Sequence, residues 1–157
     1  MSATAGQAAD GVRSLADRFG IEPGMVVMEM GYDEDVDHDL RDALADRSGN
    51  DLVDEDTDEV VDVALVWFRD GDGDLFELLT DALGPLADAG TVWLLTPKAG
   101  RDGHVEPSEI SESAPTAGLT QTSTVNAGQG LDRRAARYAA YRPRQEVDKL
   151  AGRPPRA

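Results

Sequence analysis

The 157-residue sequence contains no cysteine, only two histidines, and few aromatic residues, which make up 5% of the chain. The absence of cysteine excludes disulfides, thiolate metal sites and cysteine nucleophiles. No apolar run approaches membrane-spanning length, and residues 1–10 lack the basic region and apolar core of a signal peptide. We therefore expect a cytoplasmic protein with one domain, long enough to bury a core.

Basic residues are also scarce, because 15 Lys and Arg face 31 Asp and Glu and the formal net charge is −16. This charge argues against a general affinity for nucleic acid or anionic membranes, since polyanions repel one another. It favours solubility, and any protein partner that it attracts would be basic. The sequence does not indicate the oligomeric state.

The few basic residues are unevenly distributed. Residues 1–130 contain 7 of the 15 basic residues and 28 of the 31 acidic ones, whereas residues 131–157 contain 8 basic and 3 acidic residues. Such a change of sign predicts a boundary. We expect a disordered N-terminus at residues 1–8, an α/β domain at residues 9–130, and a basic tail at residues 131–157 that is helical in part or disordered.

What is present is a set of short apolar runs separated by helical patterns. Strands are predicted at 25–30, 51–53, 60–68, 91–97 and 119–125. Helical spacing links them at 12–19, 36–44, 75–86 and, more weakly, 107–117. Continuous apolar strands alternating with helices predict a doubly wound α/β fold with a mainly parallel sheet, Rossmann-like in organisation. In such folds ligands bind beyond the carboxyl ends of the strands.

The stretch Val26-Val27-Met28-Glu29-Met30-Gly31 resembles the first strand and acidic-x-Gly motif of S-adenosylmethionine-dependent methyltransferases. Residues 62–66 and 83–95 are similar to later strands of that family. The resemblance implies a cofactor site at Glu29, Gly31, Asp33, Asp54 and Glu55, with the last two near the ribose hydroxyls. The family continues with small glycines after this motif, whereas Tyr32-Asp33-Glu34-Asp35 follows here and would crowd the ligand and repel its carboxylate.

The cofactor loop is therefore interpreted as degenerate. We expect no bound cofactor, and a non-catalytic binding or regulatory module rather than an enzyme. The alternative is a divergent S-adenosylmethionine-dependent methyltransferase or another small-molecule enzyme.

A second resemblance, over residues 12–130, is to a family of small actinobacterial proteins with a domain of unknown function, number 3052. It is carried by residues 23–37, 52–56 and 93–107, and it implies the fold but no activity. That family ends in a strand with the pattern Trp, small residues, Arg-Leu-Val. GC-rich codons for residues 131–137, read one base later, encode Trp-Thr-Ala-Ala-Arg-Leu-Val, so we hypothesise that residues 131–157 are a frameshift product.

Two further loops contain chemically interesting residues. Asp70-Gly71-Asp72-Gly73-Asp74 resembles the start of a calcium loop, but Leu75 stands where a glycine is needed and Asp81 where a bidentate Glu is needed, so no metal site is predicted. Lys98, Arg101 and His104 are scarce basic or titratable groups near the predicted crevice, and they are candidates for binding an anionic small molecule. No catalytic residue can be assigned, because no nucleophile elbow is present and the carboxylates are too numerous to distinguish a pair.

Overall fold

The computed structural model describes residues 16–127 and 132–140. The strands are Val27–Met30 (β1), Val61–Trp67 (β2), Leu86–Pro97 (β3), Leu119–Ala127 (β4) and Arg133–Ala140 (β5); the helices are His38–Ser48 (α2), Leu75–Leu83 (α3) and Pro107–Thr116 (α4). A short helical turn at residues 16–18 precedes them.

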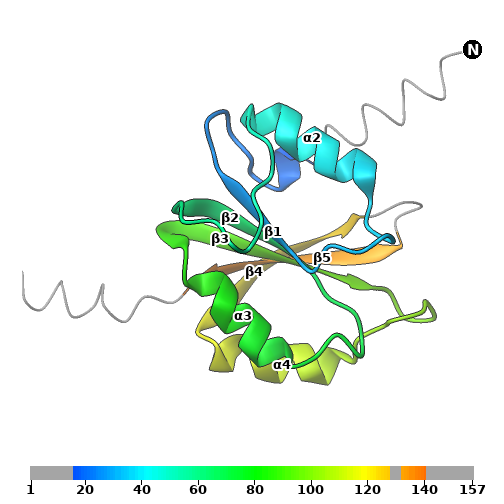
Figure 1. The fold of residues 1–157 in the computed structure, drawn as a ribbon. Coiled ribbons are helices and arrows are strands. Elements are labelled where there is room, and N and C mark those ends of the chain that lie inside the picture. Colours follow the sequence, from blue (N-terminus) through cyan, green and yellow to red (C-terminus); the bar gives the residue numbers. More distant parts are fainter. Residues whose placement is uncertain (1–15, 128–131, 141–157) are drawn as a thin grey trace, which may run out of the picture.

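The five strands form one sheet in the order β1-β2-β3-β5-β4. β1, β2 and β3 are parallel to one another, and β5 runs antiparallel to both β3 and β4. Helix α2 covers one face of the sheet, and α3 and α4 cover the other (Figure 1). The predicted doubly wound, mainly parallel, Rossmann-like α/β fold is confirmed.

Because successive side chains of a strand point to opposite faces of the sheet, the core has two layers. On the α2 face, Trp67 and Trp93 pack with Leu40 and Leu44 of the helix. Phe19 stacks on Trp93, with ring centroids 4.1 Å apart, and its carbonyl accepts a hydrogen bond from the Trp93 indole at 3.0 Å. The other layer lies against α3 and α4 and contains the opposite side chains of the same strands.

Polar residues set the ends of the helices. The Asp37 side chain accepts hydrogen bonds from the backbone N–H groups of Asp39 and Leu40, which fixes the start of α2. Gly49, with a φ of 81°, ends that helix in the left-handed conformation that favours glycine. Asp74 caps α3 by accepting from the Glu77 N–H.

Two predicted elements have different limits. The helix expected to run to residue 86 ends at Leu83, because the following Gly84-Pro85 disfavours a further helical turn, and β3 already begins at Leu86. The strand expected at residues 51–53 is reduced to a single parallel bridge between Val53 and Met28.

The predicted domain boundary at residue 130 is wrong. Residues 133–140, expected in a tail that is helical in part or disordered, form β5 between β3 and β4. Arg133, Ala135 and Arg137 face the α2 layer, and Ala136 and Tyr138 lie in the α4 layer, so the period is that of a strand. The predictions for residues 1–8 and 141–157, and for the helix before residue 16, lie outside the described residues. The frameshift hypothesis concerns the gene and stays a prediction that resequencing would test.

None of the helices in the described part of the chain is both long enough and apolar enough to cross a membrane.

Candidate functional site

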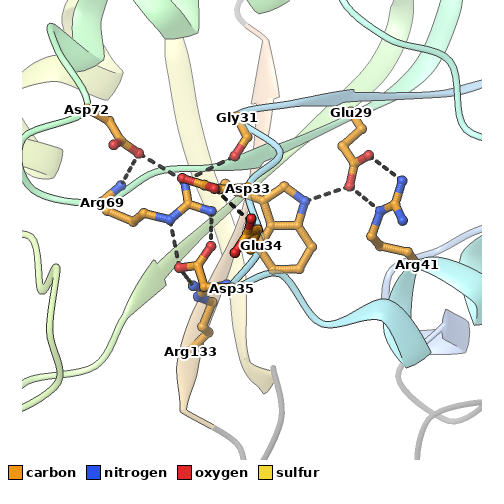
Figure 2. A network of polar contacts seen from close by, with 10 residues as sticks. Glu29, Gly31, Asp33, Glu34, Asp35, Arg41, Arg69, Asp72 and Arg133 are labelled. Atoms are coloured by element: carbon orange, nitrogen blue, oxygen red, sulfur yellow. Dashed lines mark hydrogen bonds and ion pairs between the residues drawn. The ribbon is translucent and has the colours of Figure 1, made fainter.

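The predicted crevice lies at the carboxyl end of β1, where Glu29 is held by two partners. Arg41 of α2 donates from Nε to Glu29 Oε2 at 2.6 Å and from Nη2 to Oε1 at 2.8 Å. The Trp67 indole N–H donates to Oε2 at 2.8 Å. Only 7% of the Glu29 side chain is exposed. The carboxylate is thus buried and bonded on both oxygens, and hydrogen bonding to it raises the pKa of Arg41 (Figure 2).

Gly31 brings the following loop against β2. It has a φ of 78°, and a Cβ placed there would overlap the backbone carbonyl oxygen of Trp67. Arg69, which follows β2, donates from Nη1 to the Gly31 carbonyl at 3.0 Å. The glycine is therefore required by the close approach of two segments of this chain, whether or not a ligand binds.

A second charged network anchors the same loop through Asp35. Arg69 forms a two-point ion pair with Asp35, at 2.8 Å from Nε and 2.5 Å from Nη2, and also pairs with Asp72 at 3.0 Å. Arg133 of β5 reaches Asp35 Oδ2 at 2.6 Å, and its guanidinium lies 5.0 Å from the centre of the Trp67 ring. Hydrogen bonding from Arg69, helped by the charge of Arg133, holds the pKa of Asp35 below its usual range (Figure 2).

Four of the five predicted cofactor residues line one hollow of about 460 Å³ beside these networks. They are Glu29, Gly31, Asp54 and Glu55, and the remaining wall includes Tyr32 and Arg41. Asp33 is not part of the lining; it is exposed, and its carboxylate accepts from the Glu34 N–H at 2.7 Å. Asp33 therefore lies outside this lining, and its part in a cofactor site stays a prediction.

Two side chains in the wall of the hollow contact each other. The Arg41 guanidinium lies 4.8 Å from the centre of the Tyr32 ring, as expected for a cation–π contact. Asp54 and Glu55 are exposed at the rim, where their oxygens can accept hydrogen bonds from hydroxyl or ammonium groups. The exposed carboxylates can recognise a hydroxylated or cationic group, whereas Glu29 in the same wall is already paired with Arg41.

The predicted anion-binding residues lie elsewhere, on the α4 face. Lys98 and His104 line a cavity of about 580 Å³ together with Arg134 and Tyr138 of β5. Arg101 is exposed and is not part of this lining. The structure thus brings together two of the three predicted residues and adds two from a strand that the sequence analysis assigned to the tail.

The acidic turn at residues 70–74 has internal roles. Asp72 accepts from the backbone and side chain of Arg69, and Asp74 caps α3. Across residues 16–127 and 132–140, no three His, Asp or Glu side chains lie close enough together to hold a metal ion.

Sequence analysis missed Arg41, which lines the hollow and pairs with Glu29. The sequence did offer a reason to single out Arg41, because it is the only Lys or Arg between Arg18 and Arg47 in a strongly acidic stretch. Arg134 and Tyr138 were missed because the change in charge assigned this segment to a tail that is helical in part or disordered, although alternate positions share a face in a strand.

The sequence profile of a family described as "Protein of unknown function (DUF3052)" matches residues 16–138. An uncharacterised protein of Mycobacterium tuberculosis is 54% identical over 121 residues, covering 77% of each chain, and an uncharacterised protein of Mycobacterium bovis matches equally.

Several solved structures with a similar fold are methyltransferases. A SAM-dependent methyltransferase from Aquifex aeolicus gives a TM-score of 0.54 at 15% identity, covering 82% of this chain and 89% of that one. Precorrin-6y C5,15-methyltransferase from Geobacter metallireducens gives 0.58 at 11% identity, covering 84% and 88%. A putative O-methyltransferase from Nostoc punctiforme gives 0.59 at 13% identity, covering 88% and 58%. At these identities the likeness concerns the fold alone.

Proposed function

The chain belongs to the DUF3052 family of proteins of unknown function, and we propose that it is a non-catalytic binding or regulatory module on a methyltransferase-like fold. The observation that carries the proposal is the Glu29–Arg41 ion pair. The pair lines the hollow at the carboxyl end of β1, where folds of this class bind ligands.

Displacing Arg41 from Glu29 has an energetic cost. If Arg41 withdrew, Glu29 would keep a single side-chain donor, the Trp67 indole, in a position where its carboxylate is almost fully buried. Breaking a buried pair of this kind costs about 3 kcal/mol. A ligand that needed the space would lose roughly a hundredfold in affinity, since each 1.4 kcal/mol is a factor of ten.

The loop after β1 adds a second obstacle. Asp33 and Glu34 are exposed and acidic, and Asp35 is fixed by Arg69 and Arg133. An S-adenosylmethionine molecule presents a carboxylate of its own, which neighbouring acids repel. These features support a binding role for the surface of the domain over catalysis within it.

The partner that this charge favours is a protein with a basic surface. The segment 51–60 borders the edge strand β1, carries six acidic residues, and ends at Val60, whose side chain is 67% exposed. Charge of one sign beside an exposed apolar residue can steer and then contact a basic partner. Neutralising this segment with Asp54→Asn, Glu55→Gln and Asp56→Asn should abolish salt-sensitive retention of such a partner in pull-down experiments.

A second candidate function is that of a divergent S-adenosylmethionine-dependent methyltransferase. It is favoured by Asp54 and Glu55, which line the hollow at the position where their carboxylates could accept from ribose hydroxyls.

Thermal unfolding of the full chain, with and without S-adenosylmethionine or S-adenosylhomocysteine, distinguishes the two candidate functions. A ligand at a hundred times its Kd stabilises the native state by about 2.7 kcal/mol, a shift of several degrees. We expect no shift for the natural protein at millimolar ligand, and a clear rise in Tm would overturn the non-catalytic proposal.

Two variants test whether Arg41 itself closes the hollow. Arg41→Ala should gain affinity for the adenosyl ligand. Arg47→Ala is the matched control, because Arg47 lies on the same helix and pairs with Asp17 away from the hollow. Equal behaviour of the two variants would show that Arg41 is not the barrier.

A further inference from the structure

The larger cavity, on the α4 face, has the composition of a ligand site. Its volume of about 580 Å³ lies within the range of small-molecule pockets, roughly 300–1,000 Å³. Its walls include the apolar side chains of Val105, Ile110, Ala114 and Leu119, contributed by the loop before α4, by α4 and by β4. It lies on the face of the sheet opposite α2 and the crevice at Glu29.

The charge of this lining is opposite to that of the protein. Although the chain has 31 acidic residues, the lining contains no Asp or Glu, and it contains Lys98, Arg134 and His104. Within residues 16–127 and 132–140, neither Lys98 nor Arg134 forms an ion pair. Two cations therefore lie at an apolar cavity without a carboxylate to neutralise them, which favours an anion there.

The other polar groups are also incompletely bonded. Arg134 Nη2 and the Tyr138 hydroxyl both approach Gln121 Oε1, at 3.3 and 3.5 Å, so one amide oxygen serves two donors at long distances. Tyr138 is only 2% exposed, and burial raises the pKa of its phenol, so the hydroxyl keeps its proton as a donor. His104 Nδ1 lies 3.0 Å from the Pro97 carbonyl and must donate to it, which leaves Nε2 for another partner.

We propose that this cavity binds a small organic acid, with its carboxylate between Lys98 and Arg134 and its apolar body against Ile110, Ala114 and Leu119. An inorganic anion would leave most of the volume and the apolar wall unfilled. A neutral apolar molecule would leave both cations unpaired. This inference does not depend on the closed crevice or on the proposed non-catalytic function, because it concerns different residues on the other face of the sheet.

Calorimetric titration of the full chain with octanoate and with its neutral isostere octanamide tests the proposal. We expect octanoate to bind at least about tenfold more tightly than octanamide, since a charge-assisted hydrogen bond is about twice as strong as a neutral one. Equal affinities, or no octanoate binding at millimolar concentration, would overturn the assignment.

Variants identify the groups responsible. Lys98→Gln and Arg134→Gln should each weaken octanoate binding about tenfold or more and leave octanamide binding unchanged. Arg101→Gln is the matched control, because Arg101 belongs to the same loop as Lys98 but lies outside the lining; it should change affinity less than twofold. An equal loss in Arg101→Gln would show that general charge attraction, rather than this cavity, binds the acid.

A substitution in the cavity wall tests where the apolar part of the bound acid lies. Ala114→Leu should fill part of the cavity and weaken both octanoate and octanamide, with a thermal melt confirming that the variant is folded. Undiminished binding in a folded Ala114→Leu protein would contradict the proposed position. If this variant does not fold, Arg134→Gln still tests the proposal, because Arg134 is proposed to bind the carboxylate of the ligand.

Discussion

The two hollows of this molecule differ in how their charged groups are partnered. In the hollow at the carboxyl end of β1, Arg41 is paired with Glu29, and beside this hollow Arg69 and Arg133 are paired with Asp35. Beneath α4, Lys98 and Arg134 have no ion pair among the described residues. The position of a hollow in a fold is therefore a weaker guide to binding than whether its polar groups already have partners.

Among the variants that test this comparison, Gly31→Ala should cause the largest loss in the free energy of unfolding. The added Cβ would overlap the Trp67 carbonyl, and the positive φ is strained for alanine, so the loop after β1 would have to move away from β2. We expect a loss of about 3 kcal/mol or more in the free energy of unfolding, measured by urea denaturation.

The control for that variant is Gly24→Ala. Gly24 also has a positive φ, 92°, but nothing lies within 4 Å of a Cβ placed there. Its loss should be about 1 kcal/mol, the cost of backbone strain alone. If both variants lost the same free energy of unfolding, the close approach to Trp67 would not be what holds the loop after β1 in place.

A smaller, pH-dependent effect is expected at Asp35. Its pKa in the folded protein is below the ordinary 3.8, chiefly because Arg69 donates hydrogen bonds to it. Its ionised form therefore stabilises the fold above about pH 3.8, and this stabilisation is lost as the pH falls through the lower folded pKa. Because the Asp35 side chain is 48% exposed and solvent screens its charge, Asp35→Asn should lower the free energy of unfolding at pH 7 by about 1 kcal/mol at most. The difference should vanish in strong acid.

Asp37, which lies in the same loop, should make the free energy of unfolding depend on pH in the opposite direction. Burial raises its pKa above 3.8, so ionising Asp37 costs more free energy in the folded protein than in the unfolded chain. Asp37→Asn keeps an oxygen to cap α2 and should raise stability at pH 7, with the gain disappearing as the pH falls through the raised pKa to about 3.8. Denaturation curves between pH 7 and pH 2.5 distinguish the two slopes, and parallel curves for both variants would contradict the assigned causes.

The smallest effect is expected at His38, beside the closed crevice. Its side chain is exposed, with its Nδ1 3.4 Å from Arg41 Nη1 and its ring edge-on to Tyr32 at 6.0 Å. His38→Gln should change the free energy of unfolding by less than about 0.5 kcal/mol at pH 7. A larger loss in the same denaturation assay would mean that the crevice is closed by more than its ion pairs.

Local patterns allowed much of the fold to be predicted. β1, β2 and the start of α3 follow from apolar runs and caps that need no knowledge of distant residues. The same runs brought Glu29, Gly31, Asp54 and Glu55 to one hollow, because the carboxyl ends of parallel strands share an edge of the sheet.

The remaining features depend on distant contacts. Arg133 is only 4% exposed, although a basic run ordinarily predicts a solvated segment, and it is buried because Asp35 and the Trp67 ring lie against it. That environment comes from residues far away in the sequence. The pairing of Arg41 with Glu29 was hidden for the same reason, since neither residue alone indicates its partner.

The position of β5 has a consequence for how the molecule is made. It is the last strand that the structure describes, yet it lies between β3 and β4 and is the strand with which β4 pairs. While residues up to 127 emerge from the ribosome, β3 has an open hydrogen-bonding edge and β4 has no neighbour in the sheet. This half of the sheet therefore closes only after residues 133–140 have been translated, which makes it a late step that leaves a strand edge exposed to chaperones or to other nascent chains.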